Sequence, residues 1–172
     1  MVAVAEPIVR KRLSQAELDV ICARHDRLFQ ARPGGARAVF AWMDLSGLSL
    51  RGRNLSDADF AAASLEGCDL TGCRLDNANF FGADLFEADL REGTIAAADA
   101  KLGFKVIEPR QREETQVAGA CLAGANLQRS KMAGVIAIKA DFSGAVMKDC
   151  KLVRANLKQA DFRGADLAGA DL

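Results

Sequence analysis

The chain has 172 residues, half of them apolar, and its 23 basic and 23 acidic side chains give a formal net charge of zero. This length allows one domain with a continuous core. Because the net charge is zero, the overall electrostatics of the chain give no reason to expect a nucleic acid, a membrane surface or an acidic ligand as its partner. No run approaches the roughly 18 apolar residues of a membrane helix, and the basic residues 10–12 follow the short apolar start, the reverse of a secretory signal. We therefore expect a cytoplasmic protein.

The first predicted element is a helix over about residues 14–30, inside an N-terminal segment bounded at 1–36. Ser14 and Glu17 have the spacing of a capping box, and apolar side chains follow at helical intervals. The sequence Arg-Pro-Gly-Gly at 32–35 should end the helix. We expect its apolar face to cover the start of the next segment, with Trp42 nearby.

A five-residue register runs through residues 37–100 and again through 117–172. A large apolar residue, the anchor of each unit, recurs at every fifth position. A small residue, mostly Ala or Cys, lies two places before it, and Asp or Asn usually stands between them. Gly often follows two places after the anchor, where it relieves the strain of a turn.

A period of five fits neither a helix nor a continuous strand, so each unit must be a short extended piece followed by a corner. Phenylalanine anchors recur at intervals of twenty residues, which makes four units the implied length of one coil. Like anchors then stack above one another in the core. The predicted phenylalanine ladder contains Phe40, Phe60, Phe80, Phe142 and Phe162.

Segments such as Ala83-Asp84-Leu85 and Ala165-Asp166-Leu167 match the Ala-Asp/Asn-Leu-x-x motif, so most of the chain resembles the pentapeptide-repeat family. The resemblance implies an all-β solenoid, a right-handed quadrilateral β-helix, which the N-terminal α-helix would cap. The chain is then one domain with two repeat arrays, 37–100 and 117–172.

The segment 101–116 abandons the motif and separates the arrays. Ala100 and Leu122 are 22 residues apart, which is one coil of twenty residues plus two further residues. If the phenylalanine anchors stay on the same side of the solenoid in both arrays, we expect an irregular coil with a short bulge. A loop of about 12 residues that shifts the face is the alternative. As the least repetitive element, the interruption is the best candidate for partner specificity. Its contact candidates are Phe104, Lys105, Glu108, Arg110, Arg112, Glu113 and Glu114.

Four large apolar residues occupy outward positions of the repeat. Phe81 and Phe86 directly follow anchors. Either apolar residues of the interruption fold over them, or they form a patch for a partner. Ile136 and Ile138 form a second outward pair on another side, and all four are candidate partner contacts.

Residues 165–172 are strong repeat, and an open coil end is a strand edge that needs a cover. Either two molecules meet through this C-terminal coil as a homodimer, or the sequence continues in a longer protein.

No catalytic, metal-binding or cofactor-binding constellation stands out in the sequence. His25 is the sole histidine and is expected to pack or cap on the helix, and Cys68 and Cys73 have the spacing of the repeat and not of a CxxC pair. The cysteines are expected to be reduced and buried. The repeated carboxylates, Asp44 and Asp59 among them, suit hydrogen bonds to the backbone at corners. We expect no enzyme, no cofactor and no metal.

Two main functional hypotheses remain, beside a purely structural spacer role. Four outward faces predict a protein–protein interaction module or scaffold, whose partner protein the sequence does not identify. The alternative follows from the family resemblance: some members mimic duplex DNA and protect a type II topoisomerase, DNA gyrase or topoisomerase IV, from inhibitors such as fluoroquinolones. Residues 44–99, with eleven acids and four bases, support mimicry, whereas residues 117–172, with five acids and eight bases, oppose it.

Overall fold

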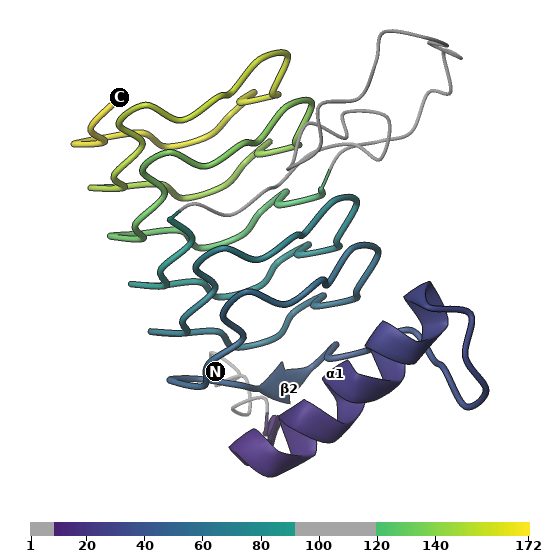
Figure 1. Cartoon of the computed structure of the whole chain (residues 1–172). Helices are drawn as coiled ribbons and strands as arrows, with labels where there is room; N and C mark the ends of the chain where they lie inside the picture. The colour runs from purple at the N-terminus through teal and green to yellow at the C-terminus, as the bar shows by residue number, and fades with distance from the viewer. Residues whose placement is uncertain (1–8, 92–119) are drawn as a thin grey trace, which may run out of the picture.

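The computed structural model describes residues 9–91 and 120–172 (Figure 1). Its elements are β1 (Lys11–Arg12), α1 (Gln15–Phe29) and β2 (Met43–Asp44), and a stack of coils follows them. The helix α1 lies across one end of the stack, and the C-terminus lies at the other end. The predicted helix is confirmed to within a residue at either end.

Each complete coil has four five-residue sides, and equivalent sides stack into flat faces. Parallel bridges join residues one coil apart, such as Val39 with Asp59 and Asp59 with Asn79. The anchor Phe60 donates its N–H to the carbonyl oxygen of Asn79 at 2.7 Å, and this bond recurs along the stack. The chain turns after every unit, so each side contributes one bridge instead of a long strand. The predicted coil of four units is confirmed.

The four faces are named here by their anchors, in chain order around the coil. The first face has Phe40, Phe60, Phe80, Leu122, Phe142 and Phe162; the second has Leu45, Leu65, Leu85, Leu127, Met147 and Leu167; the third has Leu50, Leu70, Leu90, Met132, Leu152 and Leu172; the described part of the fourth has Leu55, Leu75, Ala137 and Leu157.

The anchors fill the interior, and the corners are tight turns. The rings of Phe60 and Phe80 stack with their centroids 4.6 Å apart, and both side chains are fully buried. Gly144, two places after an anchor, has φ of 64°, a left-handed conformation that costs glycine little. One place before the anchor, the Asp59 carboxylate accepts a hydrogen bond from the N–H of Ala61 at 3.1 Å. Such corner bonds give the repeated Asp and Asn residues the structural role predicted for them.

The two arrays stack directly on each other. Asn79 forms its bridge with Cys121, and the N–H of Phe80 donates to the Cys121 carbonyl at 2.6 Å. The phenylalanine face is kept, so the predicted ladder holds. However, the expected irregular coil between Ala100 and Leu122 is wrong, because the levels of Phe80 and Leu122 are hydrogen-bonded neighbours, and the alternative of a shifted face is wrong as well. The segment 101–116 itself lies outside the described residues.

Local sequence accounts for both ends of α1. Ser14 accepts a hydrogen bond from the Glu17 N–H, and the Glu17 carboxylate accepts one from the Ser14 N–H, which completes the predicted capping box. After the helix the chain returns so close to it that a Cβ on Gly35 would lie 2.5 Å from the backbone nitrogen of Leu28. Only glycine fits this return.

The N-terminal segment closes the open edge of the first coil. β1 pairs in parallel with β2 on the second face. On the third face, the Gln15 side-chain amide donates to the Ser49 carbonyl at 2.9 Å and accepts from its N–H at 3.0 Å, as a paired strand would. On the first face, the Ala38 N–H donates to Nδ1 of His25 at 3.0 Å. The helix thus caps the solenoid, and His25 has the packing role predicted for it.

Truncation of the phenylalanine ladder should destabilise the fold in proportion to burial. Phe60→Ala leaves a cavity between two stacked rings, and we expect it to lower the free energy of unfolding by about 3–5 kcal/mol in urea titrations. Phe162→Ala, in the partly exposed last coil, is the matched control and should cost less. Equal losses would contradict the role of the stacked interior.

The stability of the fold should depend on the protonation of His25. Burial lowers its pKa below the ordinary value of 6.5, although the Ser56 backbone and the carboxylates of Asp26 and Asp57 oppose part of the shift. The unfolded chain therefore binds more protons below pH 6.5 than the native one. The free energy of unfolding should fall as pH drops below 6.5, by at most about 1.4 kcal/mol per pH unit, until the native pKa is reached.

Urea titrations between pH 7 and 5 measure this slope. The chain has one histidine, so His25→Gln should flatten it. An unchanged slope in the variant would contradict the assignment.

Candidate interaction surface

The described residues offer side chains on flat faces in place of an enclosed site. Within 9–91 and 120–172, no group of three or more His, Cys, Asp or Glu side chains could hold a metal ion. In the same residues, no helix is long and apolar enough to cross a membrane. Of the hollows found in this part of the chain, the two best formed are shallow and open. Function has to be sought on the outer surface.

Four of the five cysteines are buried, and Cys121 is half-buried on the first face. All five are free, and Cys68 and Cys73 are buried, with their thiols directed at the carbonyls of Leu45 and Leu50. Burial raises the pKa of Cys68 to about 12 and that of Cys73 to about 11. These thiols stay protonated at neutral pH, as packing residues would.

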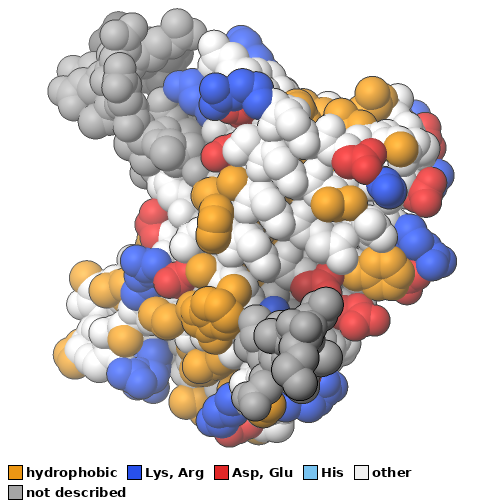
Figure 2. Space-filling view, turned by 180° about the vertical axis from the view of Figure 1, so that it is seen from behind, with side chains coloured by type: hydrophobic (Ala, Val, Ile, Leu, Met, Phe, Trp, Pro, Cys, Tyr) orange, Lys and Arg blue, Asp and Glu red, His pale blue; other side chains and the backbone are white. Residues whose placement is uncertain are grey.

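The first face carries an exposed apolar cluster, which we call the apolar patch: Val39, Ala41, Trp42, Ala61, Ala62 and Phe81. Val39, Trp42 and Phe81 are 48%, 56% and 61% exposed. Backbone hydrogen bonds place the patch on three successive levels, because the Trp42 N–H donates to the Ala61 carbonyl and the Ala62 N–H to the Phe81 carbonyl. Ala61 and Ala62 lie on the level between Trp42 and Phe81. Figure 2 shows apolar side chains on the half of the molecule that carries α1 and others toward the opposite end of the stack, with charged side chains among them.

Trp42 occupies an unusual position for a large side chain. It lies two places after the anchor Phe40, where the same corner holds Gly82, Gly124 and Gly144 in later coils. Its φ is 61°, a left-handed conformation that non-glycine residues such as Arg129 and Lys139 also adopt at corners of the stack. What distinguishes Trp42 is therefore its large, exposed aromatic side chain, the kind of residue that is enriched at protein interfaces.

Polar groups border the patch. Arg10 donates through Nε to the Ala62 carbonyl at 2.8 Å, and Arg37 lies 3.7 Å from the Asp59 carboxylate. An apolar centre with a polar rim is the usual anatomy of a protein interface.

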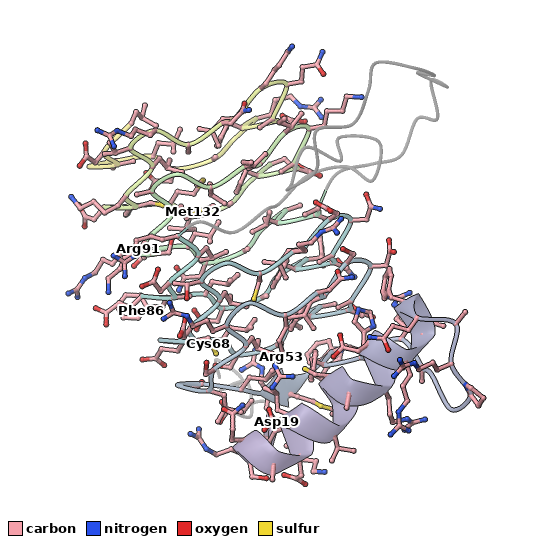
Figure 3. The ribbon with its side chains drawn as sticks, viewed as in Figure 1. Asp19, Arg53, Cys68, Phe86, Arg91 and Met132 are labelled. Atoms are coloured by element: carbon pink, nitrogen blue, oxygen red, sulfur yellow. The ribbon has the colours of Figure 1, made fainter. Side chains whose placement is uncertain are left out.

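The four residues that were predicted to point outward differ in their exposure and in the face on which they lie. Phe81 is exposed in the apolar patch. Phe86 lies on the second face, partly buried, with the Arg129 guanidinium 5.7 Å from its ring centre (Figure 3). Ile136 is half-buried, and Ile138 is only 8% exposed, so the prediction of Ile138 as an outward contact is wrong.

The remaining contact candidates lie outside the described residues: Phe104, Lys105, Glu108, Arg110, Arg112, Glu113 and Glu114. Their role stays a prediction. Sequence reasoning missed Val39 and Trp42 as contacts, although a Trp at a corner position was a readable signal.

The last coil is partly open. Its anchors Leu157, Phe162 and Leu167 are half-buried, and Leu172 is 76% exposed. The predicted homodimer through this coil stays a prediction.

The fold and the sequence agree on a family. The sequence pattern of the Pentapeptide repeats family matches residues 36–72, 54–91, 113–149 and 140–172. The chain belongs to the pentapeptide-repeat family. Its fold is the right-handed quadrilateral β-helix that the resemblance implied.

Several solved structures are similar to this pentapeptide-repeat chain. Alr5209, a pentapeptide repeat protein from Nostoc PCC 7120, is 19% identical with a TM-score of 0.51, over 92% of this chain and 98% of that one. Rfr23 from the cyanobacterium Cyanothece 51142 is 22% identical with a TM-score of 0.31, over 69% of this chain and 63% of that one. QnrB1, a plasmid-mediated fluoroquinolone resistance protein, is 19% identical with a TM-score of 0.36, over 79% and 73%.

The likeness to Alr5209 shows the fold alone. The chain spans 63% of the length of the Rfr23 structure. None of the curated proteins matches this sequence.

Proposed function

We propose that this pentapeptide-repeat chain is a non-enzymatic protein-binding module that docks a partner protein through the apolar patch. The observation that carries the proposal is the exposure of Trp42 and Phe81 on a flat face whose backbone is already hydrogen-bonded. Tryptophan and other aromatic side chains are enriched at the centres of interfaces, where they supply much of the binding energy.

The rigidity of the face supports the same conclusion. The N–H groups of Phe60 and Ala62 both donate to the next coil, at 2.7 and 2.9 Å, so the patch residues stand on a fixed frame. Little conformational entropy is then lost when a partner binds. The partner should present an apolar surface of its own.

Removal of the two aromatic side chains should abolish partner binding without unfolding the module. Trp42→Gly installs the residue that most corners of this face already have, and Phe81→Ala installs the residue found at the equivalent Ala61. We expect the double variant to lose at least tenfold in affinity for any protein that binds through the patch. Quantitative mass spectrometry of proteins captured from lysate by the wild type and the variant measures this.

Val20→Ala is the matched control, because Val20 is an exposed apolar residue of α1, 63% exposed, outside both the apolar patch and the third face. Partners lost with the double variant but kept with the control would support the proposal. Identical captures by all three proteins, with unchanged circular dichroism, would sink it.

A second candidate, topoisomerase protection by DNA mimicry, has one observation in its favour. Acidic side chains follow one another over the N-terminal coils on the second and third faces: Asp44, Glu66, Asp69, Asp84, Glu87 and Asp89. Against it, Arg129 and Lys131 occupy the next level, and Arg129 lies 2.9 Å from Glu87. The acidic run is therefore short compared with the continuous charge of duplex DNA.

A supercoiling assay with DNA gyrase and a fluoroquinolone tests this candidate. If mimicry holds, the wild type should restore supercoiling, and Glu66→Gln with Glu87→Gln should weaken protection about tenfold, because exposed acids would carry the recognition. Asp76 is left unchanged because it is only 4% exposed. Lys158→Gln on the fourth face is the control, and absence of protection at micromolar protein would rule the candidate out.

A further inference from the structure

The third face carries a column of four charges on successive coils: Asp69, Asp89, Lys131 and Lys151. Each stands one place before an anchor, and parallel bridges join Asp69 with Asp89, Asp89 with Lys131, and Lys131 with Lys151. The order is acid, acid, base, base, and Asp171 in the last coil follows Lys151 at the same position of the repeat. We call these four residues the charge column.

This order is unfavourable within one chain. Stacked positions in a sheet are about 4.8 Å apart, and like charges on directly opposed residues destabilise the pair. The column places two acids together and then two bases together, where alternating signs would attract. The position also accepts uncharged residues, as Ser49 in the first coil of the same face shows.

Partners within the chain offset only part of this cost. Asp89 lies 2.7 Å from Arg91, and Asp69 accepts a hydrogen bond from the Thr71 hydroxyl at 2.6 Å. Lys151 lies 3.6 Å from Asp171, but both side chains are more than half exposed, so this ion pair contributes little.

The column is, however, self-complementary under a two-fold rotation. An axis that runs across the third face between Asp89 and Lys131 brings Asp89 opposite Lys131 of a second copy, and Asp69 opposite its Lys151. We infer that the third face binds the third face of a second copy of this chain, with the two solenoids antiparallel. Such an isologous contact is closed and uses the same surface on both copies.

The charges beyond the column extend the match. Arg51 follows the anchor of the first coil on this face, and Asp171 precedes the anchor of the last. The same rotation brings the Arg51 level of one copy opposite the Asp171 level of the other. Each acid of the column, and Asp171, thus lies opposite a level that carries a base in the other copy, which favours this register over a parallel one, although Arg91 already pairs with Asp89 within its own chain.

The shape of the face agrees with its charge. A shallow hollow is lined by Ala133, Gly134 and Val153, with Arg91 and Arg154 beside it. Arg91 projects from the side of the stack and is 54% exposed (Figure 3). The rotation that pairs the charges also places Arg91 of the second copy opposite Ala133, where a small side chain leaves room for it.

The dimer should be weak and sensitive to salt. Six stacked levels give a face roughly 24 Å long, at the small end of specific interfaces. Exposed ion pairs are individually weak and are screened by salt. We expect association at tens to hundreds of micromolar in about 50 mM salt, weakened at least tenfold at about 500 mM.

Sedimentation equilibrium of charge-swapped variants tests the inference. Asp69→Lys with Asp89→Lys makes the column wholly basic, and Lys131→Asp with Lys151→Asp makes it wholly acidic. Each variant should be monomeric alone, whereas an equimolar mixture should form a heterodimer at least as tight as the wild-type dimer. The fourfold variant inverts the column, keeps its self-complementarity and should dimerise with itself but not with the wild type.

The inverted column also controls for folding, because it uses only residue types that this position already holds. Circular dichroism should be unchanged in all variants that are scored. A wild type that is monomeric at about 500 micromolar in low salt would overturn the inference. So would a dimer unaffected by the swaps, which would instead favour the C-terminal coil as the interface.

Discussion

Every feature of this molecule depends on the backbone hydrogen bonds that join residues one coil apart. Each anchor donates its N–H to the coil above, and the residue before it donates to the coil below, as Phe60 and Asp59 do at 2.7 and 3.0 Å. This register fixes which side chains point inward, so the interior accepts only stacked anchors and small residues. It also leaves an open edge at the start of the stack. α1 exists where it does because Gln15 and His25 supply the hydrogen bonds that a further coil would have made.

The period of the repeat determines most of the fold and can be read directly from the sequence. The five-residue spacing predicted the length of each side of the coil, and the spacing of the phenylalanine anchors predicted four sides per coil. The capping box predicted where α1 begins. The interruption could not be read in the same way, because its excess of 22 residues is close to the length of one coil. An added level and a segment outside the stack have nearly the same length, and the bridges between the two arrays, such as that between Asn79 and Cys121, distinguish the two cases.

The candidate surface was less predictable, because the repeat specifies that a side chain points outward but not what covers it. Phe81 and Phe86 occupy equivalent positions, yet one is exposed and the other lies beneath Arg129. Ile138 is also outward by register and buried in fact. The cover of Phe86 comes from Arg129 on the next coil, which is far away in sequence. Trp42 was the exception, since its place at a corner is a local departure that composition and register reveal together.

The two proposed contacts use opposite sides of one rod. In a four-sided coil the first and third faces point away from each other, so a copy bound at the charge column leaves the apolar patch free. The two-fold rotation would then direct the two patches outward on either side of the dimer. Two identical patches on one rigid body can bind a multivalent partner far more tightly than either patch alone, even when the dimer itself is weak. Partner binding would in turn favour dimerisation, because a bivalent partner holds both copies at a high effective concentration.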